Sequence, residues 1–223
     1  MLIDNLAKRV VCLKKIRRLR RKCGFTILEL VVVMAIIGIL AAILIPTILG
    51  MSEKARLASV NSTAANIRKN VDVFLVEADG ELYGLKDGAS ETFYITVSQE
   101  GDSVRWSCSA ADSNNFFDGG NVSWGSAGSY AEGEIVSNGE SLLCERLSEW
   151  FPSLKRAFMA ITVNSGQCTF VVYSDNLSTV PDSAEYPAPV DGGAPENFAW
   201  NEKPGRSSGG YLFGTSPEVP IIE

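Results

Sequence analysis

Hydrophobic and polar positions change pattern several times along the chain, and the most apolar stretch is residues 25–49. Its polar side chains are only Thr26, Glu29 and Thr47, and residues 30–45 form an unbroken apolar run. A helix over this stretch is about 37 Å long, which exceeds the roughly 30 Å hydrocarbon core of a bilayer. We therefore expect residues 25–49 to form a transmembrane helix.

An amphipathic pattern follows the apolar stretch. Apolar residues recur there at steps of three and four, which is typical of one face of a helix. These positions are Leu57, Val60, Ala64, Ile67, Val71, Phe74 and Ala78. Most charged residues lie on the other face, and Asp79 with Gly80 supplies a stop signal. Residues 50–79 are thus predicted to be the second half of one long helix. A free coiled coil is disfavoured, because its heptads lack regular flanking charges.

Residues 80–223 are rich in Gly, Ser, Asn and Asp and contain short apolar runs that are typical of strands. The expected elements are strands at residues 92–97, 104–108, 156–163 and 167–174 and a short helix at 140–151. The segment Asn164-Ser165-Gly166 joins the last two strands into a hairpin. Beyond Asp175 we expect mostly irregular surface, with one late strand near residues 211–213.

These elements predict an α+β fold. The hydrophobic half of the long helix protrudes, and its amphipathic half packs on an antiparallel sheet. The expected organisation is a basic leader at residues 1–24, a transmembrane helix at 25–49, an amphipathic helix at 50–79 and a globular head at 80–223.

Charge is distributed unevenly along the chain. Of the 20 Lys and Arg residues, nine lie within residues 1–24, together with a single acid, Asp4, so the rest of the chain is strongly acidic. The positive-inside rule places the basic end in the cytoplasm and the acidic head outside. A cleaved secretory signal is the alternative, but its apolar region is ordinarily shorter and ends at a small-x-small site that is not evident here.

The chain contains no histidine, which removes the commonest general base and the commonest metal ligand. No nucleophile and base pair stands out, so we expect no catalytic residue and no enzymatic activity. The acidic head also argues against nucleic-acid binding, because phosphate contacts need clustered Lys and Arg.

The sequence KCGFTILEL at residues 22–30, which runs into VVVMAIIGILAAILIP, closely resembles the type IV pilin and pseudopilin family. The resemblance covers about residues 22–78. It implies a pilin-like fold and a prepilin peptidase that cuts between Gly24 and Phe25 and methylates the new Phe25 amine. Glycine before the cut leaves the backbone free to extend into a protease cleft.

Glu29 is the only charge within the apolar stretch, and a carboxylate in a bilayer needs a partner. The resemblance implies that Glu29 of an incoming subunit pairs with the Phe25 amine of a neighbour, an amine that only cleavage creates. A carboxylate that reaches the membrane interface is the alternative. Gly38 and Pro46 match the family's helix-weakening positions, so a kink or partly unwound stretch between them is expected in a filament.

Three cysteines remain once the predicted leader, with Cys12 and Cys23, is removed. Because the head is exported, one disulfide is expected, and three pairings are open. We lean towards Cys144 with Cys168, with Cys108 as the alternative partner. Three reduced, buried thiols are the competing interpretation.

A loop rich in oxygen ligands contains Asp112, Asn114 and Asp118, and some pseudopilins bind calcium through such loops. The spacing does not fit the EF-hand pattern, so a polar surface turn is preferred to a calcium site. No metal or other cofactor is expected.

The function expected from the resemblance is that of a structural subunit. It is a prepilin that polymerises with copies of itself into a type IV pilus-like surface filament. Its other partners are the membrane, the prepilin peptidase and the pilus assembly platform with its ATPase. The sequence leaves open whether the filament serves adhesion, motility, DNA uptake or secretion. A minor pilin or a type II secretion pseudopilin is the alternative. A tip adhesin that uses Trp106, Trp124 or Trp200 is less favoured, because aromatic side chains more often belong to a core.

Overall fold

The computed structural model describes residues 25–80, 90–111, 124–125, 127–200 and 205–219. The chain divides into two compact units, Met1–Leu49 and Gly50–Glu223.

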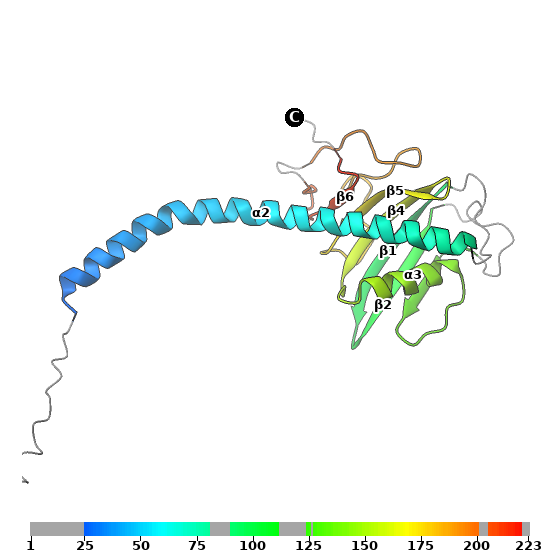
Figure 1. Ribbon diagram of the computed structural model, residues 1–223, viewed down its shortest axis with the longest axis horizontal. Helices are drawn as coiled ribbons and strands as arrows, with labels where there is room; N and C mark the ends of the chain where they lie inside the picture. Colours follow the sequence, from blue (N-terminus) through cyan, green and yellow to red (C-terminus); the bar gives the residue numbers. More distant parts are fainter. Residues whose placement is uncertain (1–24, 81–89, 112–123, 126, 201–204, 220–223) are drawn as a thin grey trace, which may run out of the picture. The chain divides into compact units, whose positions relative to one another are not determined.

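The long helix α2 runs without interruption over Ile27–Gly80 (Figure 1), which confirms the single helix expected from the sequence. Within the unit Gly50–Glu223, its predicted apolar stripe faces the core. The fully buried positions are Val60, Ala64, Ile67, Val71, Phe74 and Ala78, and Leu57 is half-buried. The amphipathic half of α2 is therefore held by packing.

The other elements form one antiparallel sheet and a short helix. The strands are β1 (Ser90–Glu100), β2 (Ser103–Ala110), β3 (Ala127–Ala131), β4 (Ala157–Asn164), β5 (Gln167–Ser174) and β6 (Gly214–Ser216), and the helix is α3 (Gly139–Trp150). They lie in the order β3-β2-β1-β4-β5-β6, and every neighbouring pair is antiparallel. The predicted α+β class is confirmed.

One face of the sheet packs against α3 and the amphipathic half of α2 (Figure 1). Asn138 caps α3, since its side-chain Oδ1 accepts from the backbone N–H of Ser141 at 2.9 Å. Trp124 belongs to this core and lies against Phe74 and Phe93, with ring centroids 6.5 and 5.9 Å away. Trp106 is buried there as well.

The other face of the sheet carries a second core that the sequence did not predict. Residues beyond Asp175 are largely irregular, as expected, but they do not form mere surface. Their buried side chains Leu177, Tyr186 and Phe213 pack on Phe158 of β4, whose ring centroid lies 5.3 Å from that of Tyr186. Because both faces are covered, seven of the eight residues of β4 are buried.

The predicted hairpin of β4 and β5 is confirmed. Ser165 and Gly166 both have positive φ, at 53° and 76°, as a two-residue type I′ turn requires. Strands β1 and β2 and helix α3 also lie where the sequence placed them. The late strand expected near residues 211–213 lies slightly further along the chain. β6 begins at Gly214, and Leu212 makes only an isolated bridge with Arg206.

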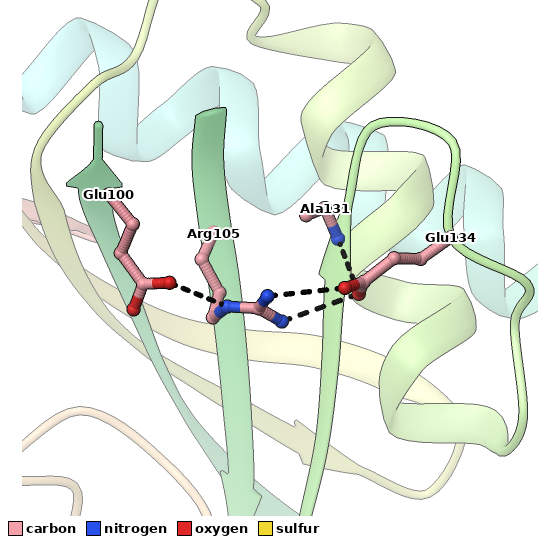
Figure 2. Close-up of polar contacts among 4 residues, drawn as sticks. All are labelled: Glu100, Arg105, Ala131 and Glu134. Carbon is pink, nitrogen blue, oxygen red and sulfur yellow. Dashed lines mark hydrogen bonds and ion pairs between the residues drawn. The ribbon is translucent and has the colours of Figure 1, made fainter. Parts of the chain in front are cut away.

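Strand β3 was missed, because its sequence AGSYA has no large apolar residue on alternate positions. Arg105 of β2 helps to fix it (Figure 2). Nε of Arg105 donates to Oε2 of Glu100 at 3.0 Å, and its terminal nitrogens hold both carboxylate oxygens of Glu134. Glu134 in turn accepts from the backbone N–H of Ala131 at 3.1 Å. Exposed ion pairs add little stability, but this fork geometry positions the end of β3.

Two contacts attach α2 to the β5–β6 end of the sheet. Arg68 and Asp72, one turn apart on α2, both bind the backbone of Cys168: Nε of Arg68 donates to its carbonyl at 2.9 Å, and Oδ1 of Asp72 accepts from its N–H at 2.7 Å. At β6, a Cβ added to Gly214 would lie 2.3 Å from the carbonyl oxygen of Val60. The backbones of α2 and β6 are therefore in direct contact.

Candidate assembly site

The start of α2 is a capping box formed by Thr26 and Glu29. The Glu29 carboxylate accepts from the backbone N–H of Thr26 at 2.9 Å and from its hydroxyl at 2.8 Å, while Oγ1 of Thr26 accepts from the N–H of Glu29 at 3.2 Å. This reciprocal pattern satisfies donors that a helix start leaves without partners.

The capping box changes the interpretation of Glu29. The sequence predicts a charge that needs a partner, whereas in the single subunit Glu29 already accepts two hydrogen bonds from Thr26. The sequence carries a signal for this cap, T-x-x-E at residues 26–29, immediately before the apolar run. The Glu29 carboxylate is exposed. The backbone N–H that it binds belongs to Thr26, the residue directly after Phe25. Chemically, it can exchange its neutral Thr26 donors for a cation.

The apolar stretch of α2 presents an exposed surface. All its large apolar side chains are exposed, from Phe25 at 77% and Ile27 at 84% to Leu49 at 64%. Among the described helices, α2 has the length and apolar composition to cross a membrane, and no part of its most apolar stretch is buried. An apolar surface of this size requires lipid or other subunits to cover it.

Gly38 and Pro46 lie within this stretch, and α2 remains helical through both. A Cβ added at Gly38 would meet no described atom within 4 Å, so the packing of one subunit does not require glycine there. Beside Pro46, the Thr47 hydroxyl donates to the carbonyls of Ile43 and Leu44 at 2.8 and 3.1 Å. Pro46 has no backbone N–H to donate to the preceding helical turn, and the Thr47 hydroxyl adds bonds to two carbonyls of that turn. The kink expected in a filament stays a prediction.

Cys108, Cys144 and Cys168 are buried, free thiols in the structure. None of the three possible pairings, Cys144 with Cys168 included, is formed in the structure. Burial, together with the Asp72 carboxylate, raises the pKa of Cys168 to about 12.

Several predicted site residues lie outside the described residues. They are Gly24 with the rest of the leader and the calcium candidates Asp112, Asn114 and Asp118. The three tryptophans weighed for ligand binding are described, and none is fully exposed. Trp106 is buried, Trp124 lies in the core, and Trp200 stacks edge-on against Phe198 with ring centroids 4.8 Å apart. This packing agrees with a structural role for these side chains.

A capped, exposed apolar helix that continues into an α+β head is the architecture of a filament subunit of the pilin class. A family model described as the prokaryotic N-terminal methylation motif matches residues 19–45. The chain is 35% identical over 96 residues to the type IV narrow pilus major component PilA5 of Thermus thermophilus, covering 41% of this chain and 82% of that protein. The chain belongs to the type IV pilin family.

Secretion proteins of the same family are also similar. The type II secretion system core protein G of Vibrio cholerae is 32% identical over 75 residues, which covers 34% of this chain and half of that protein. The corresponding protein of Aeromonas hydrophila is 36% identical over 58 residues, covering 26% and 41%. No solved structure matches. The chain is thus a prepilin-like structural subunit, and its relatives are structural proteins.

Proposed function

We propose that this chain is the precursor of a type IV pilus subunit, cut between Gly24 and Phe25, methylated on the Phe25 amine and polymerised through residues 25–49. The observation that carries the proposal is the start of α2. A single carboxylate, Glu29, sits there on an otherwise apolar and exposed helix, within the matched methylation motif.

The proposed assembly step is an exchange of partners at Glu29. Before cleavage, the nitrogen of Phe25 belongs to a peptide bond and carries no charge. Cleavage turns it into a cation, and the Glu29 carboxylate of an incoming subunit leaves its Thr26 donors for that cation on a neighbour. In a low-dielectric filament core an opposite charge is a stronger partner than a neutral N–H or O–H.

The remaining parts of the proposal concern place and partners. Residues 1–24 are a cytoplasmic leader, residues 25–49 anchor the precursor and later form the filament core, residues 50–79 support the head, and residues 80–223 form most of it. The basic leader supports an orientation with the head outside. The expected partners are copies of the same chain, a prepilin peptidase and the assembly platform with its ATPase.

The test is N-terminal sequencing of the chain recovered from sheared surface fibres. A chain that starts at methylated Phe25 supports cleavage, assembly and location together, and an intact Met1 refutes the proposal. The informative variant is Glu29→Gln, which keeps an oxygen for the Thr26 cap but removes the charge. We expect it to be processed normally while fibre yield falls more than about tenfold. Glu77→Gln, the same change at an exposed position further along α2, should leave yield unaltered.

A type II secretion pseudopilin is the second candidate function, favoured by the similarity to core protein G. The greater coverage of PilA5 favours the pilus. The composition of purified fibres distinguishes the candidates. A pilus subunit dominates fibres on the cell surface, whereas a pseudopilin is absent from them and its loss blocks secretion of exported proteins.

A further inference from the structure

The sheet topology brings two cysteines of the head together. Cys108 of β2 pairs in register with Gly128 of β3. Helix α3 crosses at this point, since a Cβ added to Gly128 would lie 2.6 Å from the backbone nitrogen of Ser141 and 2.7 Å from Cβ of Glu140. Cys144 follows Glu140 by one helical turn and therefore lies on the same face of α3.

Both side chains point into the core between α3 and the sheet. Cys144 is 0% and Cys108 2% exposed, and they share this core with Leu143 and Leu147. The neighbouring Cys144 thiol, followed by desolvation, raises the pKa of Cys108 well above its usual range. The Sγ atoms are neighbours in the folded head.

Cys168 is held elsewhere in the same core. It lies on β5, and β1 and β4 separate that strand from β2. At the usual strand spacing, β2 and β5 are about 14 Å apart, whereas a disulfide needs Cα atoms within about 7 Å. Helix α3 packs on β2 and β3, while the backbone of Cys168 is bound by Arg68 and Asp72 of α2. Cys168 is therefore far from Cys108.

We propose that Cys108 and Cys144 form an intramolecular disulfide that ties α3 to β2 in the exported head, and that Cys168 stays a free, buried thiol. This proposal rests on the proposed function for its compartment, because disulfides persist outside the cytoplasm. It replaces the pairing of Cys144 with Cys168 expected from the sequence.

The oxidant is a disulfide-bearing protein or small-molecule disulfide of the compartment that receives the head. One of the two cysteines, as its thiolate, attacks that disulfide and releases the first thiolate of the oxidant. The other cysteine then attacks the mixed disulfide and releases the second. The Cys108–Cys144 bond forms, the two thiols lose two protons and two electrons, and the oxidant is reduced to a dithiol or to two thiols. Because both Sγ atoms are buried in the folded head, the reaction precedes closure of the core.

The test is differential alkylation of the full chain isolated from cells, without reductant. Free thiols are first alkylated with N-ethylmaleimide under denaturing conditions, and the sample is then reduced, alkylated with iodoacetamide and digested for mass spectrometry. We expect N-ethylmaleimide on Cys168 and iodoacetamide label on Cys108 and Cys144. N-ethylmaleimide on all three, or a disulfide that includes Cys168, overturns the proposal.

The N-terminal peptide of the same digest separates this proposal from the proposed function. A chain that begins at Phe25 but has three free thiols refutes the disulfide alone. A chain that begins at Met1 refutes the processing, and free thiols in that chain refute the disulfide as well. The labelled pair supports the disulfide in either chain.

Variants give an independent readout. Cys144→Ala should expose Cys108 to the first reagent, whereas Cys168→Ala should leave the pair intact. In chemical unfolding, a reductant should lower the folding equilibrium constant of the parent and of Cys168→Ala by a factor on the order of 10²–10³, as the chain-entropy model gives for a loop of residues 109–143. The double variant Cys108→Ala with Cys144→Ala should not respond. An equal response in all three proteins contradicts the proposal.

Discussion

Replacing Gly214 with alanine should detach β6 from α2. The new Cβ would lie 2.3 Å from both the carbonyl carbon and the oxygen of Val60 and 2.6 Å from the backbone nitrogen of Asn61. These are backbone atoms of a helix, so no side chain can rotate away, and β6 must move instead. The movement also breaks the bond from the N–H of Thr215 to Oδ1 of Asn61, which is 3.1 Å long.

The expected loss of stability combines both effects. Overpacking of a tight contact costs about 1–3 kcal/mol, and a lost hydrogen bond adds about 1 kcal/mol. For a head of this size each kcal/mol shifts the unfolding midpoint by about 2–4 °C, so Gly214→Ala should unfold several degrees or more below the parent. Thermal unfolding of the purified chain in detergent, followed by tryptophan fluorescence, measures this shift.

Gly125→Ala is the matched control, since a Cβ there meets no described atom within 4 Å. Its midpoint should stay within about 2 °C of the parent, as is usual for substitutions that disturb no contact. Equal midpoints for Gly214→Ala and the parent would refute the close approach of α2 and β6.

Two further predictions concern the polar groups of the head. Asp72→Ala leaves the N–H of Cys168 without its acceptor and should destabilise the head by about 1–3 kcal/mol in urea unfolding, whereas the exposed neighbour Lys69→Ala should change it by less than about 0.5 kcal/mol. Burial raises the pKa of Glu140, so its folded form holds a proton more tightly than its unfolded form does. The stabilisation of the folded head by this protonated carboxyl is complete at acid pH and is lost as the pH rises through the raised pKa of Glu140. Glu140→Gln keeps an acceptor for the N–H of Gly125. The unfolding midpoint of the variant minus that of the parent should therefore increase as the pH is raised from about 4 to about 8. A constant difference across that range would contradict this reasoning.

The sequence predicted those elements in which local pattern and packing agree. The stripe of α2 has a helical period because one face is buried, and the turn at Ser165 and Gly166 is encoded by residues that tolerate positive φ. Strand β3 has no such signal, because its place depends on β2, α3 and the reach of Arg105. The second core also has no signal in the sequence, because irregular segments bury side chains without a periodic pattern of apolar residues.

For the assembly site, sequence identified Glu29 but not its partner. The capping signal at residues 26–29 is present in the sequence, but it overlaps the start of the apolar run. The cysteines show a different limit. Their number follows from the sequence, but which two meet depends on the strand order, and that order places β1 and β4 between Cys108 and Cys168.

The double attachment of Cys168 to α2 has a mechanical consequence. Tension that reaches the head along α2 acts on two hydrogen bonds to Cys168 of β5. Arg68 donates to its carbonyl and Asp72 accepts from its N–H, and these two residues lie on successive turns of α2. Because both bonds end on the same residue, they share the load and must break together, unlike bonds that open one after another. A pull on the helix is thus passed directly to β5, the strand next to the β6 edge of the sheet.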